Sequence, residues 1–385
     1  MSELVFRTVP NISLGAGKIA GLGALAKQYK IQRPFVVTDT GIVDAGLLDV
    51  CLDSLREAGL EPELFSDVVA DPPAQIVLDA ADAARKAGCD GVIGYGGGSS
   101  MDVAKLIAVL IRDEQPLSEL YGVENITSSR APLLQIPTTA GTGSEVTAVA
   151  IVTTGEFTKA GVVSPVLFAD GVILDPELTL GLPALVTAAT GIDAMVHAIE
   201  AFTSKRLKNA LSDMVALKAL DLMAKSIHTA VKDGSDLQAR SDMLLGAMLA
   251  GQAFANAPVA AVHALAYPLG GIYHIPHGLS NSLVLPHVIR FNKPDAKHLY
   301  QQLAEVILFD QERSTDAGDV TEQLADYFLN LAKELGLPTT LREMKIKESG
   351  LQQLADQSML QERLLINNPR SVNVTEAKAI YQAAY

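Results

Sequence analysis

The segment CDGVIGYGGGSSMDVAKLIAVLI (89–111) decides the fold. A short apolar run that ends at Tyr95 leads into Gly96, Gly97 and Gly98, then into two serines and a helical pattern. Glycines let the backbone approach a ligand closely, and the amides that open a helix carry partial positive charge. The segment therefore predicts a strand, a turn and a helix that form a phosphate seat. It differs from the G-x-G-x-x-G fingerprint and from a P-loop, because no Gly-Lys-Ser/Thr follows.

Two other segments repeat this arrangement of an apolar strand followed by polar residues. LLQIPTTAGTGSEVT (133–147) places small hydroxyl residues after a strand, and PFVVTDTG (34–41) ends a strand at Asp39. Hydroxyls can donate to a pyrophosphate or a ribose, whereas a carboxylate can accept from ribose hydroxyls and repel a 2′-phosphate. A single such loop is often only packing, but together they favour a dinucleotide, NAD rather than NADP. The hydroxyl residues are Thr138, Thr139, Thr142 and Ser144.

The order of apolar and helical stretches predicts two domains. Before Pro183, short apolar runs alternate with helical stretches, which is typical of an α/β domain with a largely parallel sheet. After Pro183, long Ala/Leu/Met-rich segments indicate an all-α domain. We expect an NAD-binding domain at 1–182 and a helical metal-binding and catalytic domain at 183–385, with the nicotinamide meeting the substrate between them. The expected strands are 35–38, 91–95, 133–136, 149–152 and 172–174, and the clearest helices are 47–59, 76–88, 210–231 and 237–256.

GIDAMVHAIE (191–200) and VHALAYPLGGIYHIPHG (262–278) carry metal-ligating residues at suggestive spacings. Asp193 and His197 lie one helical turn apart, so their side chains project from one face. His263 and His277 flank the second segment. One oxygen and three nitrogens suit Fe(II), Zn, Co or Ni, whereas Mg and Ca prefer oxygen ligands. A single histidine on an apolar helix is more often structural, but the joint pattern predicts a metal site.

The composition indicates which partners and compartments to expect. With 30 basic and 44 acidic residues the formal charge is −14, which would repel nucleic acid. The N-terminus has no signal pattern, and we expect no membrane-spanning segment. Cys51 and Cys89 are the only cysteines, too few for a disulfide framework. These features favour a cytoplasmic enzyme that acts on a small molecule.

The segments GGGSSMDVAK, PTTAGTGSEVT, GIDAMVHAIE and HALAYPLG…HIPHG, in this order, resemble the iron-dependent (group III) alcohol dehydrogenases, whose relatives include lactaldehyde reductase and propanediol dehydrogenase. The resemblance covers essentially the whole chain. It implies a dehydroquinate synthase-like architecture, NAD(P), a divalent metal that is commonly iron, and a homodimer or higher homo-oligomer. The implied metal ligands are Asp193, His197, His263 and His277, and the implied cofactor contacts are Asp39, Gly97, Gly98, Ser99, Asp102, Thr138, Thr139, Thr142 and Lys159.

The chain departs from the family at Tyr267. Many members have a histidine there, four residues after the first ligand of the HALAHPLG motif, which is assigned to proton transfer. A tyrosine hydroxyl, with a reference pKa of about 10, is a poor base at neutral pH. His274 or a ribose hydroxyl of the cofactor could serve instead.

These features predict hydride transfer between a small primary alcohol and NAD, assisted by a metal, preferably Fe(II), with zinc or another divalent ion as an alternative. A dehydroquinate synthase-like lyase would need a basic pocket for an acidic substrate, yet no Lys or Arg lies between Val259 and Pro286. If the chain were a non-catalytic metal-binding protein, the predicted nucleotide-binding loops would have no function.

Overall fold

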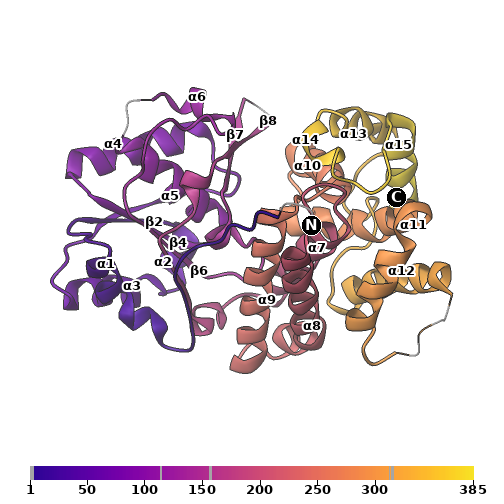
Figure 1. Ribbon diagram of the computed structural model, residues 1–385, viewed down its shortest axis with the longest axis horizontal. Coiled ribbons are helices and arrows are strands. Elements are labelled where there is room, and N and C mark those ends of the chain that lie inside the picture. Colours follow the sequence, from indigo (N-terminus) through magenta and orange to yellow (C-terminus); the bar gives the residue numbers. More distant parts are fainter. Residues whose placement is uncertain (1–3, 113–114, 156–157, 312, 314–315) are drawn as a thin grey trace. The chain divides into compact units, whose positions relative to one another are not determined.

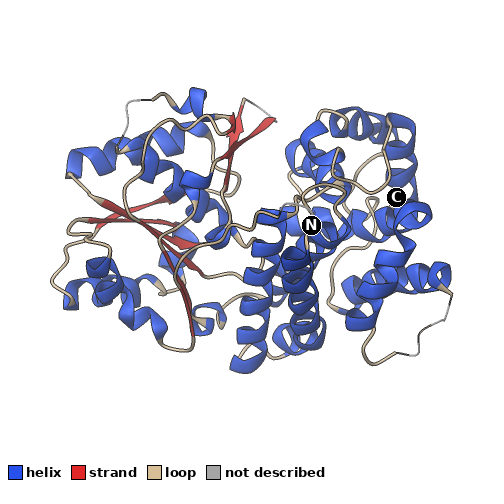
Figure 2. Ribbon diagram, viewed as in Figure 1, coloured by secondary structure: helices blue, strands red, loops and turns tan. Residues whose placement is uncertain are grey.

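The protein is described by a computed structural model that covers residues 4–112, 115–155, 158–311, 313 and 316–385. The chain divides into two compact units, Thr8–Gly181 and Leu182–Tyr385, and the N-terminal segment up to Arg7 belongs with the second. Among the described residues, all named strands lie in the first unit (Figure 2). The expected α/β region followed by a helical region is confirmed.

Within the described residues, the first unit contains a six-stranded sheet in the order β1-β9-β6-β4-β2-β3, and every neighbouring pair is parallel. Parallel strands need crossovers, which the intervening helices provide. The edge strand β3 was missed in the sequence because ELFSDV lacks a continuous apolar run. The strands of this sheet are β1 (Ile12–Leu14), β2 (Pro34–Asp39), β3 (Glu63–Val68), β4 (Gly91–Gly96), β6 (Leu133–Pro137) and β9 (Gly171–Leu174).

Helices cover both faces of this sheet (Figure 1). On one face, alternate strand residues such as Val36, Ile93 and Leu134 pack in one core cluster with residues of α1 and α3. On the other face, the Gln135 amide donates to the Met101 carbonyl of α5 at 3.0 Å. Burial on both faces explains why the central strands read as continuous apolar runs. The helices of this unit are α1 (Leu22–Gln28), α2 (Thr40–Asp44), α3 (Leu48–Glu57), α4 (Ala74–Ala87), α5 (Gly98–Leu110) and α6 (Leu117–Leu120).

The sequence predicted that the apolar run at 149–152 is a strand of the largely parallel sheet, and this prediction was wrong. The run lies in β7 (Val149–Thr154), which pairs antiparallel with β8 (Thr158–Val163), and β8 pairs in parallel with β5 (Gly122–Val123). The Asp102 carboxylate accepts from the Ile151 backbone N–H at 2.9 Å, so α5 supports this second sheet. Periodicity alone could not separate the two sheets, because both strand types are apolar and short.

The second unit is built from long helices among its described residues. α8 begins at a capping box, in which the Asn209 side chain accepts from the Ser212 backbone and the Ser212 hydroxyl accepts from the Asn209 backbone. α10 ends at Tyr273, and the next residue, His274, caps it in a left-handed conformation with φ 56°. The helices are α7 (Ala184–Thr203), α8 (Ala210–Lys232), α9 (Leu237–Asn256), α10 (Ala261–Tyr273), α11 (His277–Ile307), α12 (Ala317–Glu334), α13 (Leu351–Ser358), α14 (Glu362–Leu365) and α15 (Val374–Ala383).

By length and composition alone, α7 could cross a membrane, but 78% of its apolar window is buried inside the structure. α9 and α10 pass the same test only as a joined pair, and they are bent by 107°. Neighbouring helices therefore cover the apolar surface of α7, as they do for a core helix of a folded domain.

Candidate metal centre and cofactor pocket

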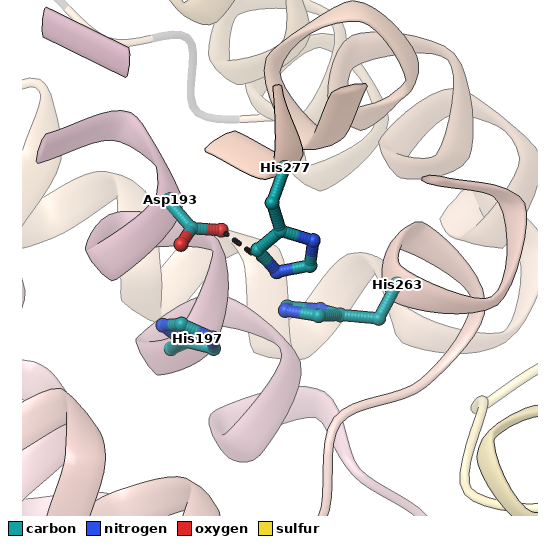
Figure 3. Close-up of side chains that lie close together, drawn as sticks. All are labelled: Asp193, His197, His263 and His277. Atoms are coloured by element: carbon teal, nitrogen blue, oxygen red, sulfur yellow. Dashed lines mark ion pairs between the residues drawn. The ribbon is translucent and has the colours of Figure 1, made fainter. Parts of the chain in front are cut away.

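Three helices of the second unit bring four metal-ligating side chains together (Figure 3). α7 carries Asp193 and His197 on successive turns, α10 carries His263, and α11 begins at His277. One donor atom of each residue lies within 4.8 Å of the others. Donors bound to one ion at about 2.1 Å lie at most about 4.2 Å apart, so a slight contraction would close the site around an ion. We call Asp193, His197, His263 and His277 the metal cluster.

Ring stacking and close helix packing hold the cluster in place. The His197 ring stacks between Phe254, at 4.5 Å between centroids, and His263, at 4.7 Å. His277 follows at 5.3 Å from the His263 ring. Next to His277, a Cβ on Gly278 would lie 2.5 Å from the Ala189 carbonyl oxygen. Only glycine therefore lets the start of α11 approach α7 this closely.

The donor chemistry of the cluster fits a divalent cation. The Asn281 amide nitrogen lies 2.5 Å from Asp193 Oδ1, 3.3 Å from His263 Nε2 and 3.2 Å from His277 Nε2. An amide group has two hydrogens and cannot serve three acceptors at once. The buried cluster thus presents more acceptors than this amide can satisfy, and a cation would satisfy them. Asn281 did not stand out in the sequence, although it follows His277 by one helical turn.

The electrostatics keep the Asp193 carboxyl ionised, as a metal ligand must be. Burial by itself would raise the pKa of Asp193. The neighbouring imidazoles of His277, His197 and His263, with the hydrogen bond from Asn281, outweigh burial and lower the pKa. Asp193 Oδ1 also lies 3.7 Å from His277 Nε2, so the carboxylate and this imidazole face each other across the cluster (Figure 3).

A further buried acid contacts the cluster and was missed in the sequence. Glu200 Oε2 lies 2.6 Å from His263 Nδ1, and Oε1 accepts from the Val262 backbone N–H at 2.6 Å. Glu200 is 3% exposed. Its position seven residues after Asp193 puts both acids on one face of α7, which is the signal that could have revealed it.

The first unit contains a cavity of about 430 Å³ at the carboxyl ends of its strands. Asp39, Gly97, Gly98 and Ser99, all predicted cofactor contacts, line it together with Thr40 and residues 68–70. The Asp39 carboxylate accepts from the Ile42 backbone N–H at 3.2 Å and from the Ser100 hydroxyl at 3.2 Å. Crevices at strand ends of open α/β sheets are where nucleotides bind.

The glycine turn (residues 96–98) and the threonine loop (residues 138–142) lie against each other beside this cavity. A Cβ on Gly98 would lie 2.8 Å from Thr142 Cγ2, and one on Gly97 would lie 3.8 Å from Thr139 Oγ1. The buried Thr138 hydroxyl has no hydrogen-bond partner within the described structure. A buried hydroxyl without a partner beside a glycine turn fits a polar ligand.

The structure places Asp102 and Lys159 in contacts within the protein. Asp102 Oδ1 accepts from the Ser144 hydroxyl at 2.5 Å and from Lys105 Nζ at 3.2 Å. Lys159 Nζ lies 2.5 Å from Asp71 Oδ1, and the Lys159 side chain is 11% exposed. Their predicted roles in cofactor binding remain predictions.

The two predicted proton carriers occupy different surroundings. Tyr267 is half-buried in α10, and its ring centroid lies 6.0 Å from that of His277. His274 is exposed at the end of α10. Tyr267 therefore stands beside the metal cluster, whereas the left-handed backbone of His274 directs the turn into α11.

Both units of the chain match models of known protein families. Residues 10–176 match a family model described as iron-containing alcohol dehydrogenase, and residues 187–385 match the Fe-containing alcohol dehydrogenase family, C-terminal. Long-chain-alcohol dehydrogenase 1 of Geobacillus thermodenitrificans (strain NG80-2) is 38% identical over 390 residues, which cover 100% of this chain and 97% of that protein.

Two solved protein structures resemble this chain over its full length. The crystal structure of 1,3-propanediol oxidoreductase is 34% identical, with a TM-score of 0.96 and 100% of both chains covered. Sulfoacetaldehyde reductase from Bifidobacterium kashiwanohense in complex with NAD+ is 29% identical, with a TM-score of 0.88 and 100% of this chain and 99% of that chain covered. These similarities support neither a lyase nor a non-catalytic metal-binding protein. The chain belongs to the iron-containing alcohol dehydrogenase family.

Proposed function

We propose that this protein interconverts small primary alcohols and aldehydes, with NAD as the hydride carrier and Fe(II) as the preferred metal. The observation that carries the proposal is the metal cluster, four donor atoms within 4.8 Å in a chain of this family. We further propose that the unit Thr8–Gly181 is the cofactor domain and that the helical unit is the metal and catalytic domain.

Asp193 and the imidazoles of His197, His263 and His277 would hold the ion. A divalent ion held there would polarise the alcohol or carbonyl oxygen and favour loss of the hydroxyl proton. Tyr267, whose ring centroid lies 6.0 Å from that of His277, would hold that proton or a water, with His274 as a second candidate. The cluster lacks thiolates, so zinc or another divalent ion could replace iron according to supply.

The residues of the 430 Å³ cavity would bind NAD. Gly97, Gly98 and Ser99 open α5, whose first backbone N–H groups suit a pyrophosphate. Asp39 would accept from a ribose hydroxyl and repel the 2′-phosphate of NADP. Thr138, Thr139, Thr142, Asp102 and Lys159 complete the proposed cofactor contacts.

The substrate class follows from the charge around the metal cluster. No Lys or Arg lies between Val259 and Pro286, so nothing in this stretch would pair with an anionic substrate. Two relatives are named for uncharged alcohols, a long-chain alcohol and propanediol, whereas sulfoacetaldehyde reductase is named for an anionic aldehyde. The missing Lys and Arg in this stretch favour the uncharged class. A small uncharged primary alcohol or its aldehyde is therefore the proposed substrate.

The test measures the near-ultraviolet absorbance of NADH with metal-loaded protein and a panel of primary alcohols and aldehydes. We expect turnover with Fe(II) under anaerobic conditions and none after chelation of the metal, restored by adding metal back. Undiminished turnover in the chelated protein, or none with any substrate despite bound metal and NADH, would contradict the proposal.

We also propose a cytoplasmic homodimer or higher homo-oligomer without nucleic-acid partners. The chain has only two cysteines, Cys51 and Cys89, and both are free thiols, which suits a reducing compartment. Leu185, Leu207 and Met214 expose between 57 and 71% of their surface in a single copy, and a second copy could cover them. Light scattering on the eluted protein measures the assembly.

A further inference from the structure

Behind His263, on the side opposite to its Nε2 atom, lies a carboxylate with two defined partners. Glu200 accepts from His263 Nδ1 through Oε2 and from the Val262 backbone N–H through Oε1, both at 2.6 Å. Both residues are nearly fully buried. Water therefore has little access to this contact, and the hydrogen bond to the charged group is strong.

The contact decides which ring nitrogen of His263 carries the proton. A carboxylate only accepts hydrogen bonds, so the proton lies on Nδ1 and the Nε2 atom keeps a lone pair. Nε2 is the atom that lies 3.3 Å from the Asn281 amide nitrogen, within the metal cluster. A histidine ligand needs a lone pair that points toward its metal. Glu200 keeps that lone pair on Nε2, because it holds the ring proton on Nδ1.

Glu200 also balances charge. Asp193 contributes one negative charge to the cluster, and a divalent ion would leave one positive charge uncompensated in a buried site. Buried charge is costly unless it is paired. Glu200, from the same face of α7, provides the second negative charge.

We propose that Glu200 is a positioning residue for the metal centre. Its carboxylate holds His263 in the tautomer that can bind a metal, and its negative charge balances the charge of the ion. The proposal rests on the ligand set of the proposed function. A purely structural role is the rival explanation, because the Val262 N–H belongs to the first turn of α10 and Glu200 also caps that helix.

Glu200→Gln separates the two roles. A carboxamide has one acceptor for the two donors that the carboxylate serves. If its oxygen caps Val262, its NH₂ group faces His263 Nδ1 and forces the proton onto Nε2. We expect the Zn(II) dissociation constant of purified metal-free protein, measured by chelator competition, to rise about 10- to 100-fold. The thermal unfolding of the metal-free protein should change little.

Two further variants make the test specific. Glu200→Asp keeps two acceptors on a shorter side chain and should recover part of the affinity. Thr203→Val, on the same helix and equally buried, removes only a hydroxyl that donates within the helix to the Ile199 and Glu200 backbone carbonyls. It leaves the Glu200 carboxylate in place and should bind zinc as the wild type does. Nitrogen-15 NMR of labelled histidine should show His263 protonated on Nδ1 in the wild type and on Nε2 in Glu200→Gln.

The outcomes distinguish this inference from the proposed function. If wild-type protein binds no zinc, the ligand set itself is wrong. If wild type binds zinc and Glu200→Gln binds it equally well with an unchanged His263 tautomer, only the role of Glu200 is overturned. Should Glu200→Gln fail to fold, the same comparison is made with Glu200→Asp, for which wild-type affinity together with a changed tautomer would refute the proposal.

Discussion

The metal cluster and the cofactor cavity are built in opposite ways. The cluster gathers side chains from three helices and buries most of them, and its contacts join residues up to 88 positions apart. The cavity is lined by short runs at 39–40, 68–70 and 97–99, each at the end of a strand or the start of a helix. Side-chain chemistry defines the first region, whereas backbone and small residues define the second.

This difference teaches how each region should respond to mutation. A metal site with four protein donors depends on each of them, because a lost donor leaves the remaining buried groups without their common partner. A cavity of backbone groups and small residues spreads the binding energy over many contacts, so single changes there should have graded effects.

The largest expected effect is that of His277→Ala, which removes a donor from the cluster. We expect loss of stoichiometric metal and a fall in turnover of roughly 10³-fold or more, several kcal/mol in the barrier. Metal analysis and the NADH assay measure both. His298→Ala, exposed on the same helix α11, is the matched control and should keep metal and activity. If His277→Ala kept stoichiometric metal and full activity, His277 would not be a ligand. The contrast between the metal cluster and the cofactor cavity would then fail as well.

Gly98→Val should affect the cavity but not the cluster. The Cβ would lie 2.8 Å from Thr142 Cγ2, so the two loops must separate. Overpacking of about 1–3 kcal/mol corresponds to roughly 5- to 150-fold weaker NADH binding, measured by fluorescence titration. Gly21→Ala, with open space around it, is the control. A loss of metal affinity in Gly98→Val would show that the two regions are not independent.

Asp39→Gly tests cofactor choice within the cavity. We expect NADP use to improve on the order of 10-fold, about 1.4 kcal/mol, because a carboxylate near the 2′-phosphate is removed. Asp39 also caps α2, so Asp39→Asn, which keeps an acceptor for the Ile42 N–H, separates charge from capping. Unchanged kcat/KM for NADP in both variants would place Asp39 away from the adenosine ribose.

The smallest effect is expected for Tyr267→Phe, at the edge of the cluster. We expect turnover to fall less than about 10-fold, although an obligatory acid–base group would contribute roughly 10²-fold or more. A divalent ion at the cluster would lower the pKa of the alcohol hydroxyl, so its proton would need little help to leave, and His274 could take it in place of Tyr267. The pH–rate profiles of Tyr267→Phe and His274→Ala decide between the two. Collapse of the tyrosine variant alone would assign the relay to Tyr267.

Much of the fold and of the metal cluster was predictable because their signals are local. The central strands read as continuous apolar runs, and the helices of the second unit showed helical spacing with bounds close to those observed, as at α8 and α9. Asp193 and His197 share a helical face by their spacing alone. The edge strand β3 lacks that signal, and β7 carries it without showing which sheet it joins.

The sequence by itself determined which residues could bind a metal and a dinucleotide, because residue type and spacing fix their chemistry. Only the tertiary structure decided how they are supported. It set Glu200 against His263, directed the Asn281 amide toward Asp193, and turned Asp102 toward Ser144 and Ile151. These contacts join separate elements, and their partners depend on how the helices and strands pack, which no local pattern encodes.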